Sequence, residues 1–190
     1  QRLMTSNAPF SQAELAERLG RVVARRIGGA GEILQLRRLT GGATKQTWAF
    51  SSVIDGETRD FILQMVGELP SVDSDHPRAG MPRVAGRDET LLMLAGMGAG
   101  VPTPPVRVAF DASDGLGIGH ITDFVPGETI ARKLLREPEY AELRKNFAFQ
   151  CGEAVGKLHR IDPASLPFLV SFGAEIQVAK YKQIYHSFGY

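Results

Sequence analysis

A glycine-rich segment between two β-rich stretches has the residue types that suit binding of an anion. It reads LTGGATKQTWAF over residues 39–50, with Gly41 and Gly42 at its centre. Because glycine carries no Cβ, the backbone N–H groups of such a turn can approach a phosphate closely. An ordinary hairpin turn also favours glycine. The segment alone therefore leaves both interpretations open, and the surrounding elements have to decide between them.

Alternating apolar residues and tight-turn signals around this segment predict a β-sheet. Asp55-Gly56 is a strong two-residue hairpin signal between alternating stretches. FILQMV, at residues 61–66, is typical of a mostly buried strand that follows this hairpin. The full set of expected strands covers residues 33–39, the run beginning at 47, and residues 61–66, 106–110 and 118–124.

Helices are predicted before, within and after these strands. Ser11 and Glu14 have the spacing of a capping box, which places the first helix at about 11–28. A second helix at about 82–97 carries Glu89, and an ordinary solvated carboxylate remains one interpretation of that residue. Further helices are expected at 128–136, from Pro138 to about 161, and at 174–187. The long one has a regular apolar stripe that includes Cys151, for which we expect core packing.

Composition excludes several classes of function. The chain has 22 basic and 21 acidic residues, so its formal net charge of +1 gives no general case for nucleic acid or an anionic membrane as a partner. The single cysteine forms no internal disulfide and no thiolate cluster, which suits a reducing, cytoplasmic location. No apolar run reaches the roughly 18–20 residues that span a bilayer.

Four stretches follow one another in a distinctive order: LTGGATKQTWAF (39–50), GRDETLLMLAGMGAGVPTPPV (86–106), ITDFVPGETI (121–130) and GEAVGKLHRIDPASLPFL (152–169). The order of the elements resembles the small lobe of a protein-kinase-like fold, and the four stretches are similar to the aminoglycoside phosphotransferase family. The resemblance implies an α+β fold: a five-stranded antiparallel sheet with an inserted helix, then the first helices of an α-helical large lobe. It implies a nucleotide-binding small lobe at 1–122, a linker at 123–127 and the beginning of the large lobe at 128–190.

The resemblance also implies residue roles. The linker would bind the purine edge through backbone groups near Asp123 and Val125, and Glu89 would pair with a basic residue of the third strand. In this chemistry the protein mainly positions phosphates and neutralises developing charge. The residues expected to cover the triphosphate are Gly41, Gly42, Ala43, Thr44 and Lys45.

The sequence departs from the family pattern on the third strand. The position expected to carry a lysine or arginine is Gln64, which can donate a hydrogen bond to phosphate but supplies no charge. Three explanations stay open. Catalysis tolerates the glutamine, or Arg59 or Lys45 substitutes for the missing cation, or the nucleotide site is weakened.

A second departure concerns the catalytic loop. LHRID, at 158–162, is similar to the kinase H-R-D motif, but it has one extra residue and no asparagine follows it. The only asparagines are Asn7 and Asn146, and no aspartate follows Asp162. We therefore expect His159 and Asp162 to be structural, and we assign no catalytic residue and no metal ligand. The expectation is that these 190 residues are the front part of a longer kinase.

Three functions remain as hypotheses. The first is a phosphotransferase that uses ATP or GTP with Mg²⁺ and acts on a hydroxyl group of a small molecule, active only with a downstream part. The second is a catalytically silent, pseudokinase-type nucleotide-binding or interaction module. The third is an interaction protein without a nucleotide site. The acceptor substrate and the oligomeric state do not follow from the sequence.

Overall fold

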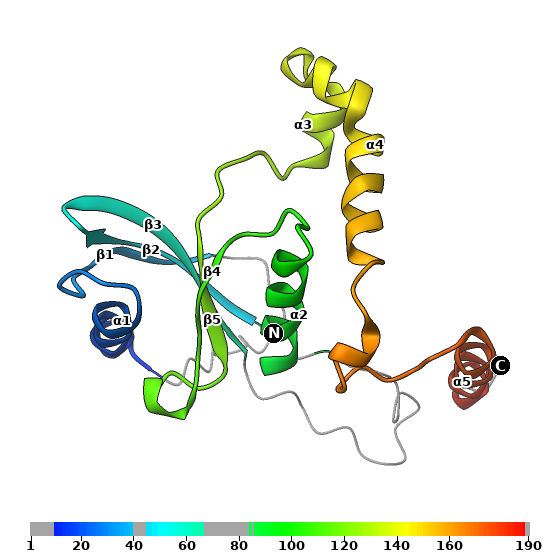
Figure 1. Ribbon diagram of the computed structural model, residues 1–190, viewed down its shortest axis with the longest axis horizontal. Helices are drawn as coiled ribbons and strands as arrows, with labels where there is room; N and C mark the ends of the chain where they lie inside the picture. The colour runs from blue at the N-terminus through cyan, green and yellow to red at the C-terminus, as the bar shows by residue number, and fades with distance from the viewer. Residues whose placement is uncertain (1–9, 40–44, 67–83, 85, 189–190) are drawn as a thin grey trace.

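Five antiparallel strands form one sheet in the order β1-β2-β3-β5-β4 (Figure 1). The structure, a computed structural model, describes residues 10–39, 45–66, 84 and 86–188. The sheet and its accompanying helices confirm the α+β fold expected from the sequence. The strands are β1 (Ile33–Leu39), β2 (Lys45–Ile54), β3 (Glu57–Val66), β4 (Val106–Ala109) and β5 (Gly119–Asp123).

The β2–β3 hairpin forms at the predicted turn. Ile54 pairs with Glu57, so Asp55 and Gly56 alone make the connection. Both have positive φ, 52° and 82°, which is the conformation that a two-residue turn of this kind requires. The strand before the turn begins at Lys45, two residues earlier than expected from the apolar pattern.

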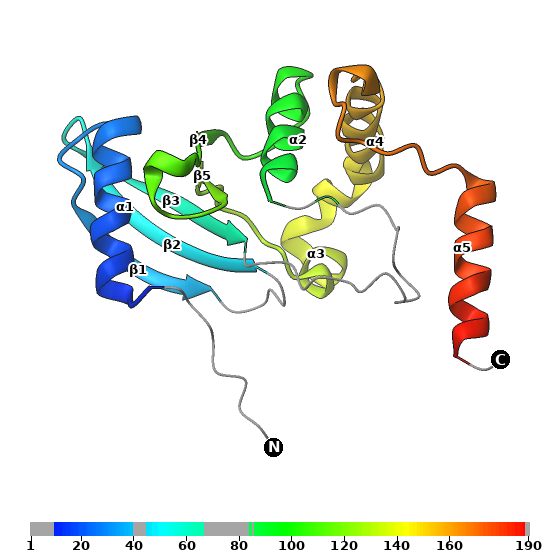
Figure 2. The ribbon, with the colours of Figure 1, turned by 90° about the horizontal axis from the view of Figure 1, so that it is seen from below.

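Helix α1 (Gln12–Arg26) covers one face of the sheet, as Figure 2 shows. The predicted capping box is present: Ser11 N–H donates to the Glu14 carboxylate at 2.8 Å, and Glu14 N–H donates to Ser11 Oγ at 3.3 Å. The helix and the sheet together form the hydrophobic core. Its most buried members include Leu15, Leu19, Val22, Val23, Phe50, Phe61, Leu63, Val108 and Ile121.

Helix α2 (Arg87–Gly98) is attached to the β4–β5 side of the sheet. It begins at Arg87 rather than near Pro82; Val84 lies outside the helix, and residues 82–83 are outside the described part of the chain. Gly86, at its N-cap, has φ 64° and makes no side-chain cap hydrogen bond. The chain therefore enters α2 through a backbone conformation that glycine adopts readily, without a polar cap.

The helices that follow the sheet bury none of their residues, so the expectation for Cys151 was wrong. Cys151 is exposed, because the apolar stripe of its helix faces no other part of the described chain closely enough to be covered. In Figures 1 and 2 the last helix lies well away from the sheet. These helices are α3 (Ala131–Arg136), α4 (Ala141–Leu158) and α5 (Ala174–Ser187), with short 3-10 segments at Ala112–Asp114, Pro138–Tyr140 and Pro163–Ser165.

Over the described residues, no helix combines the length and the apolar character needed to cross a bilayer.

Candidate functional site

The face of the sheet opposite α1 carries the polar residues that the sequence singled out. Side chains alternate between the two faces of a strand. Because Phe61 and Leu63 point into the core, Gln64 lies on the other face. Gln64 pairs in register with Thr47 on one side and His120 on the other. Cross-strand partners share a face, so these three side chains form a polar row across the sheet.

A hollow of about 230 Å³ opens on this face beside the segment that leaves β5. Gln64 and Thr122 contribute from the sheet, Met93 from α2, and Val125 from the segment after β5. The hollow therefore brings the third strand, the inserted helix and the expected linker to one place. Its full lining is Ile62, Gln64, Met93, Pro104, His120, Thr122, Asp123, Phe124 and Val125.

Lys45 and Glu89 form an ion pair at the end of this face. The Lys45 ammonium donates to the Glu89 carboxylate, which joins the first residue of β2 to the first turn of α2. The two side chains are 32% and 26% exposed, so the pair is partly shielded but accessible. The basic partner of Glu89 therefore comes from β2, and not from the third strand, where the resemblance placed it.

A buried hydrogen bond fixes α2 against β5 directly beside this pair. Thr90, next to Glu89, places its hydroxyl oxygen 2.9 Å from Nδ1 of His120, and both residues are buried. Burial lowers the pKa of His120; the nearby Glu89 carboxylate opposes that shift, and the nearby Lys45 ammonium adds to it. The imidazole is therefore held in its neutral form, behind the ion pair.

The segment expected to be the linker is held by hydrogen bonds on both sides. Asp123 N–H donates to the Pro105 carbonyl at 3.0 Å, and Phe124 N–H donates to the Asp60 carbonyl at 3.0 Å. Arg107 binds the Asp123 carboxylate through two hydrogen bonds, at 2.7 and 2.5 Å, and that contact raises the pKa of Arg107. Because Arg107 holds this carboxylate and Pro105 accepts from the Asp123 N–H, the group of Asp123 that is left for a ligand is its backbone carbonyl.

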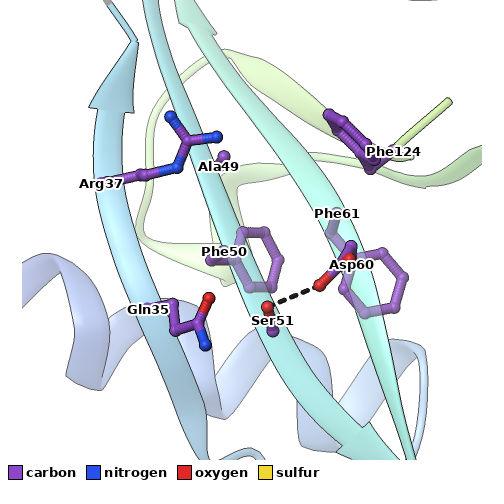
Figure 3. A pocket seen from close by; sticks show the side chains of 8 residues that line it. All are labelled: Gln35, Arg37, Ala49, Phe50, Ser51, Asp60, Phe61 and Phe124. Carbon is purple, nitrogen blue, oxygen red and sulfur yellow. Dashed lines mark hydrogen bonds between the residues drawn. The ribbon is translucent and has the colours of Figure 1, made fainter. Parts of the chain in front are cut away.

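A second hollow of about 220 Å³ lies on the β1–β2 side of the same linker. In Figure 3, Arg37 and Phe124 stand at its edges, and Ser51 donates a hydrogen bond of 2.6 Å to Asp60 across it. Phe124 lines both this hollow and the one near Val125.

The structure places five of the expected site residues and leaves four outside the described part of the chain. Lys45 contacts Glu89, whereas Gln64, Asp123 and Val125 line a common hollow. The four for which no placement is described are Gly41, Gly42, Ala43 and Thr44.

The LHRID sequence does not contribute to this site. The Asp162 carboxylate accepts a hydrogen bond of 2.9 Å from Ala164 N–H and so caps a 3-10 turn, which is a structural role. Nor do the described residues contain a group of three or more His, Cys, Asp or Glu side chains that could hold a metal ion.

Sequence reasoning missed the residues that support the expected ones. Thr90 and His120 fix the helix of Glu89, and Arg107 holds Asp123. One signal was available: alternation about the apolar Ile121 places His120 and Thr122 together on the opposite face. The partners of these residues depend on tertiary packing, which the local pattern does not carry.

Comparison with known proteins identifies one family. The model of the phosphotransferase enzyme family (APH) matches residues 35–177, which is most of the chain. The match includes most of β1, the other four strands, α2, the segment after β5 and α4. A comparison with curated proteins finds no match to this chain.

Proposed function

The chain belongs to the phosphotransferase enzyme family, and we propose that it is the nucleotide-binding part of an ATP- or GTP-dependent kinase that phosphorylates a hydroxyl group of a small molecule. The observation that supports this best is the position of the hollow near Val125. It lies between the sheet, α2 and the linker, and the Lys45–Glu89 pair stands beside the same polar row.

In this proposal the hollow receives the base. Its volume of about 230 Å³ is below the ~300–1,000 Å³ of typical ligand pockets, so it holds a ring system rather than an entire nucleotide. Apolar contacts would come from Ile62 and Met93. Backbone groups of Asp123 and Val125 would bind the polar edge of the purine, which needs one acceptor and one donor.

The triphosphate would extend from the base toward the beginning of β2. Gln64 lies opposite Thr47 of β2. Lys45 precedes Thr47 by two residues on the same face of β2, so the two residues are about 7 Å apart at the usual rise of a strand. Gly41 and Gly42 immediately precede this strand in the sequence. Their backbone N–H groups would cover the phosphates, because in phosphoryl transfer the protein acts chiefly by positioning and charge neutralisation.

The proposed organisation is a small lobe at 1–122, a linker at 123–127 and the beginning of a helical lobe at 128–190. The exposed apolar side chains of α4 and α5, such as Phe149 and Val178, agree with helices that belong to a larger helical body. The proposal assigns no catalytic base and no metal ligand within these residues, because no asparagine or aspartate follows Asp162.

One observation favours a second candidate, a nucleotide-binding module without catalysis. Gln64 is neutral where the resemblance expects a cation. Such a module would still bind nucleotide in the same hollow, so binding and turnover have to be measured separately.

The test is thermal unfolding of the chain with ATP, GTP and adenosine, followed by nucleotide consumption against a panel of hydroxyl compounds. We expect ATP or GTP to raise the Tm, and Gly42→Val to reduce that rise. Gly127→Ala, in open space at the last residue of the proposed linker, should keep the rise. Binding with consumption supports the kinase. Binding without consumption of nucleotide supports the silent module, and the absence of any shift would contradict both.

A further inference from the structure

Glu89 is paired with a cation from a strand other than the third. The third strand, β3, carries Gln64 at the position where a basic residue was expected. The cation that reaches the helix carboxylate is Lys45, on β2. Of the three explanations left open by the sequence, this contact favours substitution by Lys45.

Arg59, the other candidate, lies elsewhere. It is on the same strand as Gln64 but five residues away, near the β2–β3 turn, and its guanidinium is 3.7 Å from the Glu57 carboxylate. It lines a separate hollow with Arg107, Asp123 and Phe124. No contact joins it to Glu89 among the described ion pairs, so Arg59 is badly placed to act beside Gln64.

Lys45 lies next to residue 64 on the same face of the sheet. Lys45 is opposite Val66, and Gln64 is opposite Thr47, so Lys45 and Gln64 are diagonal neighbours on adjacent strands. Diagonal neighbours are typically about 7–8 Å apart at the backbone, well within reach of a long side chain. A lysine on β2 can therefore direct its ammonium to the region that a lysine on β3 would serve.

The ammonium of Lys45 has capacity for a second partner. It carries three N–H donors, and the described contact with Glu89 uses one carboxylate oxygen. Partial exposure of both side chains leaves the pair open to an approaching anion. Glu89, itself held by the neighbouring Thr90–His120 bond, would orient the ammonium in the way that carboxylates orient lysines in ion pairs.

We propose that Lys45 is the phosphate-binding cation of this protein, relocated from β3 to β2, and that Gln64 serves beside it as a neutral hydrogen-bond donor. The assignment rests on the proposed nucleotide-binding function. Glu89 is then a positioning residue that acts through Lys45. The relocation keeps one positive charge at the site while residue 64 of β3 is neutral.

The experiment compares binding of ATP and of adenosine by calorimetry, because only ATP carries the phosphates. For Lys45→Met we expect a loss of at least tenfold in ATP affinity with adenosine affinity within twofold. Gln64→Lys, added to Lys45→Met, should restore ATP affinity to within about threefold of the unmodified protein. Arg59→Met is the matched control, because it also removes a partly exposed cation from this sheet. It should change neither the ATP affinity nor the adenosine affinity.

The outcomes separate this assignment from the function on which it rests. An unmodified protein that binds neither ligand would overturn both. ATP binding that survives Lys45→Met, or that is lost in Arg59→Met, overturns the assignment alone. Equal losses of ATP and adenosine affinity in Lys45→Met show a structural role and also overturn it. If that variant does not fold, Lys45→Gln is measured in its place, and Lys45→Arg should keep ATP affinity within a few-fold.

Discussion

The hydroxyl oxygen of Thr90 lies 2.9 Å from Nδ1 of His120, and this buried contact joins α2 to the central part of the sheet. Since Glu89 is the preceding residue of the same helix, the contact also determines where the Lys45–Glu89 pair can form. The buried Thr90–His120 hydrogen bond therefore helps to position the partly exposed Lys45–Glu89 ion pair.

Protein stability should fall as pH decreases below the ordinary pKa of histidine. Burial lowers the pKa of His120 from its ordinary 6.5, so the unfolded chain binds a proton at a pH where the folded chain does not. Stability from this residue is complete above pH 6.5 and declines as the pH drops from 6.5 toward the folded pKa, by up to about 1.4 kcal/mol per pH unit. Calorimetric Tm values at pH 7.5 and 5.5 should differ less in His120→Gln, and an unchanged difference would contradict the prediction.

Asp114 should be a stability determinant far from the site. Its side chain is fully buried, accepts hydrogen bonds from Arg25 and from Arg26 (3.1 Å), and also accepts from Asp111 N–H at 2.9 Å. Asp114→Asn keeps the shape but removes the charge that both arginines of α1 use. Because the arginines are partly exposed and can be rehydrated, we expect a loss of ~1–3 kcal/mol in urea unfolding.

Asp111→Asn is the matched control for that experiment. Asp111 is more than half exposed, and its side chain caps the 3-10 turn by accepting from Ser113 N–H at 2.8 Å. Asparagine makes the same cap, and the surface pair with Arg26 contributes ~0–1 kcal/mol. Equal losses in the two variants would show that burial of the Asp114 charge is unimportant.

A methyl group at residue 119 should disturb the strand that carries Gln64. A Cβ built on Gly119 would lie 2.1 Å from the Gln64 carbonyl oxygen, so β3 and β5 approach as closely as they do only because residue 119 is glycine. We expect Gly119→Ala to destabilise the protein by ~1–3 kcal/mol through overpacking. Gly127→Ala, which meets nothing within 4 Å, should change the unfolding free energy by less than ~0.5 kcal/mol.

Local signals explain why much of the scaffold was predictable. The Asp55-Gly56 turn and the Ser11–Glu14 capping box each depend on residues within four positions of one another, so the sequence pattern contains the whole interaction. The beginning of α2 was misplaced because its polar side-chain cap is absent. Gly86 makes the entry by its backbone alone, whereas Pro82 gave an upstream helix-start signal.

Long-range contacts explain what the sequence could not supply. Lys45 and Glu89 are 44 positions apart, and their pairing depends on how α2 packs against the sheet. The stripe that contains Cys151 gives the opposite case. Periodicity predicts that one side of α4 is apolar, but it does not tell whether any part of the chain covers that side, and here none of its residues is buried.

The linker amide at residue 125 should govern recognition of the base. Val125 precedes Pro126, so its backbone is already restricted to extended conformations. A proline at 125 can adopt such a conformation but removes the N–H that the proposed function directs at the purine edge.

Val125→Pro should therefore lower adenosine and ATP affinity by a similar factor of about tenfold or more, in contrast to the phosphate-specific effect of Lys45→Met. Val125→Ala, which keeps the amide, should retain affinity within about threefold, and calorimetric titration of both variants, with their Tm values as a folding check, measures the difference. A proline variant that folds and binds adenosine normally would show that the base is bound elsewhere.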